Sequence, residues 1–527
     1  MNILLKRTSY LILAGVLGTS TLIGCGKKAE VAKESNKLSE ISVMIFDRAN
    51  VPEGEGTLTN NRWTKYINEE MAKQGVKVNF VSVPRSEESQ KIPVMMASKT
   101  AADIMFAYNR TLVEQWYKDG GTIELSDLIN KYGKDLKNYV TEDVLKLCKT
   151  AEGKQFAIAA RRSVTQANNA FIRKDWLDKL GMKIPTTPDE LYTALKAFKE
   201  KDPGNVGKGK VVAYGGSVGN DGNLLGLAFT NIKDEKSYYM DTIKLPSVNT
   251  VGHAYRNPGY KEFLIFKNKL YNEGLTDPEY FTSQNAQKEK EAFVSGTLGY
   301  WETDVMANVD ILRGGLLQNL RKKVPDADMV SMPPLKNIND GKQYNIAYNP
   351  GGGLIFIPKT AKDPVACMKY LNFIAGKGGE TVYFGKEGTN YSVKDGVKLP
   401  IDSKLNAKQL DWIKGDLLLV GNNGYFKKQE EAIKTIASMN PAYSDYILKD
   451  YADAGAGIKL EVQNYVSPIE AKQGVNLDKV FVDYRVKLTT CKPSEFESIY
   501  KKFKVELEKY QIKEILAERA EYYNKQK

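Results

Sequence analysis

Short apolar runs alternate with helical stretches through the first part of the folded chain, and this pattern limits the fold more than any other feature. Residues 41–46 (ISVMIF) and 76–83 predict strands, and the stretch around Trp63 to Met71 between them has helical spacing. A second helical stretch at 87–97 precedes a third apolar run at 102–106. This alternation predicts an α/β fold with a largely parallel or mixed sheet.

Two segments carry the signals of a helix start. Thr187-Pro188-Asp189-Glu190 supplies a hydroxyl cap, a proline at the first helical position and a reciprocating glutamate. Ser494 and Glu497 predict the same start for a long C-terminal helix. Its apolar residues recur every three or four positions, so we expect them to pack on the body and not to hold a cofactor. They are Phe496, Ile499, Tyr500, Phe503, Leu507 and Tyr510.

The N-terminus predicts secretion. Lys6 and Arg7 precede a short apolar stretch at residues 10–16, which is too short for a comfortable membrane span. Small and apolar residues follow, as in a cleaved signal peptide. We therefore expect residues 1–24 to be a signal peptide.

Cys25 predicts a lipid anchor. Residues 22–25 (LIGC) resemble the bacterial lipobox, whose cysteine is lipidated and becomes the new N-terminus. The alternative is a plain signal peptide with a chance cysteine. Residues 25–40 are polar and predict a flexible tether. No later run of 18 apolar residues occurs, so residues 41–527 are expected to form a folded body tethered to the extracellular side of the cell membrane.

Histidine and cysteine are scarce, and this restricts the chemistry. His253 is the single histidine, which excludes any metal site that needs two imidazoles and leaves one candidate for a Ser-His-Asp triad. Besides Cys25, the cysteines are Cys148, Cys367 and Cys491. We expect them to be small buried hydrophobes with at most one disulfide. No metal and no cofactor are expected.

The formal net charge of the chain is +12, and removal of Lys6 and Arg7 with the leader leaves it strongly positive. Such a balance could favour anionic ligands or an anionic envelope. The lysines are spread along the chain and mixed with acids, without any nucleic-acid-binding motif. Nucleic acid is therefore not an expected partner.

A glycine-rich segment, Asn349-Pro350-Gly351-Gly352-Gly353, precedes a strand-like run at 354–357. No Gly-Lys-Ser/Thr follows it, which argues against a phosphate-binding P-loop. The glycines instead predict a hinge or a close backbone approach to a ligand.

Several segments together resemble one protein family. Residues 95–104 (MMASKTAADI) are similar to a segment of family 1 extracellular solute-binding proteins, and residues 152–158 look like the crossover strand of that family. The most specific stretch is 172–181 (IRKDWLDKLG), which resembles the signature of the lipoprotein-type oligosaccharide-binding components of bacterial ABC importers. Residues 270–275 and 384–388 match later segments, so the resemblance covers nearly the whole mature chain.

The resemblance implies a periplasmic-binding-protein fold, in which two α/β lobes joined by crossing hinge strands hold the ligand in the cleft between them. It implies a monomer that captures an oligosaccharide and delivers it to the permease subunits of an ABC transporter, without catalysis. Each lobe is then discontinuous in sequence. We expect the first lobe mainly at 41–155 plus a later segment near 300–350, and the second mainly at 156–295 with parts of 355–527.

Ligand-binding residues are expected where strands end in loops. A sugar is bound there by aromatic faces and planar polar groups, which sets the residue types to look for. Trp176 is not among them, since with Leu177 and Leu180 it has the spacing of a buried helix face. Trp301 is the strongest candidate because it stands beside two carboxylates at a strand end. The candidates are Asp47, Arg48, Tyr108, Asn109, Arg161, Arg162, Tyr300, Trp301, Glu302, Asp304, Asn349 and Tyr391.

Two alternatives to oligosaccharide capture stay open. The chain could be a surface-anchored glycosidase or lyase, with Glu302 and Asp304 as paired carboxylates that need no histidine. It could also bind a peptide or another small solute. A test for turnover distinguishes the first alternative from oligosaccharide capture, because a binding protein returns its saccharide unchanged.

Calcium is not expected in the loop after the helix that begins near Thr187. Many members of the resembling family carry an EF-hand-like loop there, with oxygen ligands at its first, third, fifth and ninth positions. Here Asp202 holds the first position, but Gly204, Val206 and Lys210 hold the others. The sequence predicts a glycine-rich surface turn.

Overall fold

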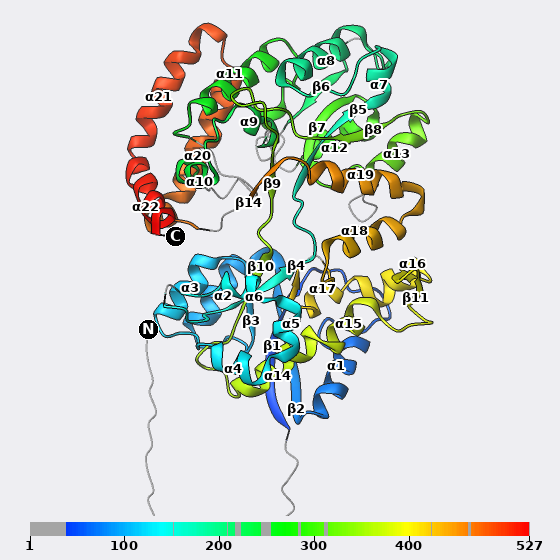
Figure 1. Cartoon of the computed structure of the whole chain (residues 1–527), viewed down its shortest axis with the longest axis vertical. Helices are drawn as coiled ribbons and strands as arrows, with labels where there is room; N and C mark the ends of the chain where they lie inside the picture. Colours follow the sequence, from blue (N-terminus) through cyan, green and yellow to red (C-terminus); the bar gives the residue numbers. More distant parts are fainter. Residues whose placement is uncertain are drawn as a thin grey trace, which may run out of the picture. The chain divides into compact units, whose positions relative to one another are not determined.

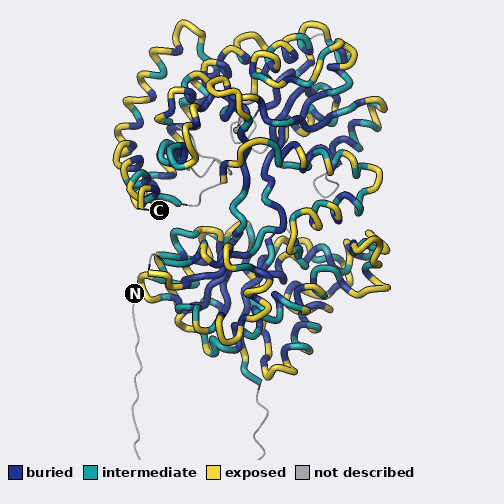
Figure 2. Tube along the Cα trace, viewed as in Figure 1, coloured by how far each residue is buried: buried dark blue, intermediate teal, exposed yellow. Residues whose placement is uncertain are grey.

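In the computed structural model, two sheet-and-helix lobes are built from the body of the chain (Figure 1). Buried strands run through the middle of each lobe (Figure 2). Among the described residues, no helix has both the length and the apolar character needed to cross a membrane. The predicted signal peptide, Cys25 and His253 lie outside the described residues. The structure describes residues 38–150, 152–207, 209–216, 223–243, 255–282, 286–309, 315–422, 424–461 and 465–525.

The first lobe combines the start of the body with a segment that returns after residue 350. β1 and β2 pair in parallel, and a second sheet has the strand order β13-β4-β10-β3. Its elements are β1 (Ser39–Asp47), α1 (Arg62–Ala72), β2 (Val76–Pro84), α2 (Glu88–Ala97), β3 (Met105–Ala107), α3 (Arg110–Lys118), α4 (Ser126–Tyr132), α5 (Lys134–Val140), α6 (Glu142–Lys146), β4 (Ile158–Arg162), β10 (Gly351–Phe356), α14 (Pro364–Ala375), α15 (Lys377–Phe384), β11 (Tyr391–Lys394), β12 (Val397–Pro400), α16 (Ser403–Asn406), α17 (Lys414–Leu417) and β13 (Gly421–Asn422).

The second lobe is built around a sheet of order β6-β7-β5-β8, beside which β14 and β9 form a parallel pair. Two apolar clusters fill it, one of which includes the C-terminal helices. Its elements are β5 (Asn168–Arg173), α7 (Lys174–Lys179), α8 (Pro188–Lys201), β6 (Val212–Gly215), α9 (Asn223–Phe229), α10 (Glu235–Asp241), α11 (Pro258–Asn272), α12 (Gln287–Ser295), β7 (Leu298–Asp304), α13 (Leu316–Lys323), β8 (Met329–Met332), β9 (Tyr344–Ala347), α18 (Gln429–Ser438), α19 (Ser444–Ala454), β14 (Ile458–Glu461), α20 (Pro468–Thr490), α21 (Phe496–Glu508) and α22 (Ile512–Lys525).

The sheets correct the predicted lobe boundaries. β7 and β8 flank β5 as antiparallel neighbours, so the segment near 300–350 completes the second lobe and not the first. Conversely, β10 inserts between β3 and β4, and the first-lobe core continues through residues 354–420. The sequence pattern could not show this exchange, because strand pairing joins residues far apart in the chain.

Predictions from local sequence patterns agree with the structure near the start of the folded body and partly fail near its C-terminal end. The predicted strands and helices at 41–106 appear as β1, α1, β2, α2 and β3. At α8, Thr187 Oγ1 accepts a hydrogen bond from the Glu190 amide at 3.2 Å, as predicted. The predicted Ser494 cap is wrong, because a 3-10 turn at Pro493–Glu495 precedes α21. The predicted long helix is divided in two near Gln511, whose φ of 58° is left-handed.

Two of the cysteines are core residues, as predicted. Cys148 and Cys367 are fully buried and free, and Cys491 is free and half-buried. Trp176 is also fully buried, and its ring contacts Phe198 edge-on at 5.2 Å. Trp176, Cys148 and Cys367 are therefore not exposed enough to contact a ligand.

Hydrogen bonds bind the connections between the lobes to one another. The Tyr348 amide donates to the Thr165 carbonyl at 2.7 Å, and the Arg162 amide donates to the Pro350 carbonyl at 2.8 Å. The Thr165 amide donates to the side chain of Gln429 at 3.0 Å. Among the described residues, the segments that pass between the lobes are 163–167, 348–350 and 424–428.

Candidate ligand-binding cleft

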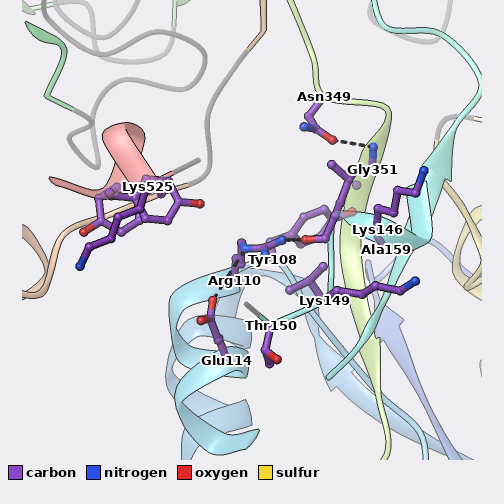
Figure 3. Close-up of a pocket in the computed structure, with 15 residues that line it drawn as sticks. Tyr108, Arg110, Glu114, Lys146, Lys149, Thr150, Ala159, Asn349, Gly351 and Lys525 are labelled. Atoms are coloured by element: carbon purple, nitrogen blue, oxygen red, sulfur yellow. Dashed lines mark hydrogen bonds and ion pairs between the residues drawn. The ribbon is translucent and has the colours of Figure 1, made fainter. Parts of the chain in front are cut away.

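A cleft of about 570 Å³ is lined by residues of both lobes (Figure 3). The first lobe contributes the end of β3, the start of α3 and the glycine-rich start of β10, and the second contributes α22 and the residue Tyr465. The lining residues are Tyr108, Arg110, Glu114, Lys146, Leu147, Lys149, Thr150, Ala159, Asn349, Gly351, Gly352, Leu354, Tyr465, Tyr522 and Lys525.

Tyr108 follows the last residue of β3 and is 40% exposed. Its ring contacts Phe106 edge-on at 5.3 Å, and the Arg85 guanidinium lies 4.7 Å from its centroid. Its hydroxyl accepts a hydrogen bond from Asn422 Nδ2 at 3.2 Å. These contacts fix an aromatic side chain at the cleft, where an amphipathic ring can meet a sugar.

Tyr465 and Tyr522 place aromatic rings at the cleft from the second lobe. The two rings are parallel, with centroids 3.7 Å apart, and Lys525 follows one helical turn later. Burial raises the pKa of Tyr465 to about 12. Sequence reasoning missed these residues. For Tyr522, the sequence signal was its place beside a second tyrosine in the C-terminal helix. Only one of two adjacent residues can face the core, and here Tyr523 is buried and Tyr522 is not.

Arg162 connects the cleft to the hinge. Its guanidinium lies 4.5 Å from the centroid of the Tyr348 ring, and Nη1 donates to Asn422 Oδ1 at 2.9 Å. Since Asn422 also donates to Tyr108, one amide joins the hinge arginine to the cleft tyrosine. Burial lowers the pKa of Arg162, because a guanidinium ion is less stable away from water.

The glycine-rich segment allows close packing beside this network. A Cβ on Gly352 would lie 2.7 Å from Asn422 Cγ, and one on Gly353 would lie 2.3 Å from the Phe106 ring. Asn349 Oδ1 accepts the Gly351 amide at 2.9 Å, which shapes the turn into β10. The close approach made by these glycines is therefore to neighbouring side chains of the first lobe.

Of the residues predicted from sequence, Tyr108 and Asn349 line the cleft. Arg162 does not line it, but bonds to Asn422, which bonds to Tyr108. Asn109 instead caps α3 by accepting the Leu112 amide at 3.0 Å. Tyr391 lines a separate pocket of about 80 Å³. Arg161 donates to the carbonyls of Tyr139 and Lys427.

The loop after β1 is held by its own contacts. Asp47 Oδ1 accepts the Ala49 amide at 2.8 Å. Arg48 makes two hydrogen bonds to Asp416, at 2.8 and 2.9 Å, and so ties this loop to α17. Neither residue lines the cleft.

The structure contradicts the predicted ligand site at the end of β7, because most of its residues are buried. Tyr300 and Trp301 are each 1% exposed, and the Trp301 ring packs edge-on against Phe293 with centroids 6.4 Å apart. β7 lies between β5 and β6, and helices cover both faces of this sheet, so its side chains point into cores. Only Asp304, at the strand end, is exposed.

Glu302 is a structural carboxylate. It accepts the amides of Leu224 and Leu225, both at 2.9 Å, and the Tyr300 hydroxyl at 2.7 Å. A carboxylate is favourable at the start of a helix such as α9. Burial raises its pKa, and its oxygens are occupied by these donors. The arrangement gives no support to Glu302 and Asp304 as a catalytic pair.

The described residues hold no cluster of three or more potential metal ligands. In the loop after α8, Asp202 accepts the amides of Val206 and Gly207 at 3.0 and 2.8 Å. Its carboxylate therefore stabilises the turn itself. Calcium independence stays a prediction.

A family model for bacterial extracellular solute-binding proteins matches residues 56–381 of this chain. Among curated relatives, Lipoprotein LipO of Bacillus subtilis is 25% identical, with 78% of this chain and 79% of LipO covered. The polygalacturonan/rhamnogalacturonan-binding protein YtcQ, also of Bacillus subtilis, is 23% identical, with 81% and 82% covered.

The solved structure of the Streptococcus pneumoniae ABC-transporter substrate-binding protein FusA with kestose has a TM-score of 0.63 to this chain. Its sequence is 19% identical, and 92% of this chain and 99% of FusA are covered. This likeness confirms the predicted fold, with two α/β lobes joined by crossing strands. The chain belongs to the bacterial extracellular solute-binding proteins.

Proposed function

We propose that this chain captures an oligosaccharide outside the cell and delivers it to the permease of an ABC importer. The observation that carries the proposal is that tyrosine rings from both lobes, Tyr108 on one side and Tyr465 and Tyr522 on the other, line one cleft. The names of YtcQ and FusA, which specify saccharides as their ligands, support a sugar as the cargo.

The geometry suits reversible capture. Tyrosine faces pack against the C–H faces of a sugar ring, while hydroxyl and amide groups bridge its hydroxyls. Closure of the lobes about the crossing strands would exclude water and bring the two sets of rings onto one ligand. No bond in the ligand changes in this process.

Calorimetric titration with a panel of neutral and acidic oligosaccharides, and with short peptides, tests the proposal. We expect stoichiometric binding of a saccharide that is recovered unchanged by mass spectrometry. Tyr108→Ala should weaken this binding by about 1–3 kcal/mol, or about ten- to a hundred-fold. Tyr132→Ala, at an exposed tyrosine on α4, is the matched control. Peptide binding alone, or cleavage of the saccharide, would contradict the proposal.

We further propose that Cys25 carries the lipid that holds the protein at the membrane. The lipobox-like residues 22–25 and the polar residues after them support this. Cys25→Ala should abolish labelling by palmitate and move the protein from the membrane fraction to the medium. A mutant that still partitions with membranes and still takes up label would show that the anchor lies elsewhere.

A further inference from the structure

The two tyrosine rings that the second lobe brings to the cleft come from segments far apart in the chain. Tyr465 lies two residues before Ser467, the N-cap of α20, and Tyr522 lies in α22. Their rings are parallel, with centroids 3.7 Å apart. The rings can form one aromatic surface only while the two segments are held together. Whatever joins the start of α20 to α22 therefore shapes the second-lobe half of the cleft.

Arg519 joins these two segments. It is fully buried and lies on α22, one helical turn before Tyr522. Its Nη1 donates to the Tyr465 carbonyl and to Glu470 Oε2, both at 3.1 Å. Its Nε and Nη2 donate to the Tyr239 carbonyl at 3.4 Å. The guanidinium also lies 5.9 Å from the centroid of the Tyr465 ring. One side chain of α22 thus contacts the cleft residue on which Tyr522 stacks.

Glu470 gives Arg519 a fixed partner. Its side chain is fully buried, and its Oε2 accepts the Ser467 amide at 3.1 Å, which closes the capping box at the start of α20. The Ile469 amide donates to Glu518 Oε2 at 3.0 Å, a second bond between this turn and α22. Breaking a buried ion pair is costly, because it leaves one charge without compensation. The start of α20 is therefore held to α22 at two points.

Arg173 offers a comparison within the same lobe. It is equally buried, bonds to Asp175 at 2.7 and 2.8 Å, and lies 4.3 Å from the centroid of the Trp176 ring. Its Nη1 donates to the Gly296 carbonyl at 2.9 Å. None of these partners is among the residues that line the cleft. Both arginines hold a buried ion pair beside an aromatic ring, but of the two it is Arg519 that contacts a cleft residue.

We infer that Arg519 is a positioning residue for the ligand-binding cleft. Paired with Glu470, it keeps Tyr465 stacked on Tyr522, so that the two rings meet a sugar as one preformed surface. The inference rests on the proposed saccharide-binding function. Rings that are already in place when the ligand arrives lose less conformational freedom on binding, and this raises affinity. Arg519 is enclosed, so it acts through Tyr465 and not by touching the sugar.

Calorimetric titration of the double variant Arg519→Met/Glu470→Gln tests this, because the two changes together leave no unpaired charge in the core. The titrant is the oligosaccharide that the wild-type protein binds most tightly in the panel of neutral and acidic oligosaccharides. We expect its affinity to fall about tenfold. Arg519→Lys keeps a cation beside Glu470 and should retain part of the affinity.

Arg173→Met/Asp175→Asn is the matched control, because it removes a buried ion pair of the same lobe away from the cleft. It should lower the unfolding temperature and leave the affinity of the folded protein unchanged. Thermal unfolding of each variant sets the temperature at which the titrations are made.

Two further measurements separate positioning from a loss of stability. Tyr465→Ala should itself weaken binding, and adding Arg519→Met/Glu470→Gln to it should weaken binding little further, because the ring through which Arg519 acts is gone. Nitration by tetranitromethane, mapped on peptides by mass spectrometry, should increase at Tyr465 and Tyr522 in the Arg519→Met/Glu470→Gln variant. It should not increase there in the Arg173→Met/Asp175→Asn control.

The possible outcomes separate the two proposals. Wild-type affinity in a folded Arg519→Met/Glu470→Gln protein, or an undiminished further loss in the Tyr465→Ala background, would overturn the inference and leave saccharide capture standing. If that double variant does not fold, Arg519→Lys is compared with the wild type in both backgrounds, and unchanged affinity there would overturn the inference. A wild-type protein that binds no saccharide would contradict the proposed function itself, and the nitration of Tyr465 and Tyr522 would still show whether Arg519 holds the two rings.

Discussion

The ends of β4 and β7 were both predicted from sequence to carry ligand-binding residues, but their surroundings in the folded chain differ. Arg161 and Arg162 end β4, and the chain then leaves the first lobe. Arg162 bonds there to Asn422, which in turn bonds to the cleft residue Tyr108. Trp301 and Glu302 lie near the end of β7, between two other strands, and are enclosed. A polar or aromatic residue near a strand end is therefore a good site candidate only where neighbouring elements leave that strand end uncovered, as they do at Tyr108 after β3.

The largest effect that tests this comparison is expected at Trp301. Trp301→Ala removes a fully buried ring from the cluster that includes Phe293, so the free energy of unfolding should fall by about 3–5 kcal/mol. Saccharide affinity of the folded fraction should not change. Denaturant melts paired with calorimetry check both quantities. A weakened affinity at an unchanged unfolding midpoint would return Trp301 to the site.

A smaller effect is expected at Asp450 on α19, whose carboxyl group is fully buried. Burial, helped by Asp453, raises the pKa of Asp450 to about 8, against the opposing influence of Ser331, Asn308 and Lys449. The folded chain then binds this proton more tightly than the unfolded chain does. The free energy of unfolding therefore falls as pH rises from about 4 to about 8.

Asp450→Asn should remove this penalty. The variant should match the wild type near pH 4 and become more stable with rising pH, by about 3 kcal/mol at pH 6. Urea melts across this range measure the difference, with the exposed Asp445→Asn on the same helix as control. A pH-independent difference would contradict the assignment.

The smallest expected effect is at the glycine beside Asn422. Gly352→Ala would press on Asn422 and displace the amide that bonds to the Tyr108 hydroxyl, so saccharide binding should weaken about tenfold, with a stability loss of about 1–2 kcal/mol. Gly474→Ala is the contrasting control, because nothing lies within 4 Å of its Cβ in the interior of α20. That variant should gain about 0.5–1 kcal/mol and bind normally. Equal behaviour of the two variants would contradict the role given to Gly352.

Local physics made part of the fold predictable. Apolar periodicity located β1 and α1, and Thr187 with its proline located the start of α8. The lobe boundaries were not predictable in this way, because they depend on which distant strands pair. The places of Tyr108 and Asn349 at the cleft follow from the rule that binding residues gather where strands end in loops. Tyr465 and Tyr522 do not, since their place at the cleft is set by the tertiary packing of the C-terminal helices.

The position of β4 in its sheet has a consequence for the order in which the protein can fold. Its partners are β10 and β13, and the pair Ile158–Ile355 shows how much later in the chain they lie. A chain that folds from its N-terminus therefore presents β4 with no strand beside it until the strands of the second lobe's main sheet have followed it. Long-range pairing of this kind slows folding and leaves unpaired strand edges exposed. The lobe that begins first along the chain is thus completed late, and proteolysis or aggregation during folding should begin at its unfinished sheet.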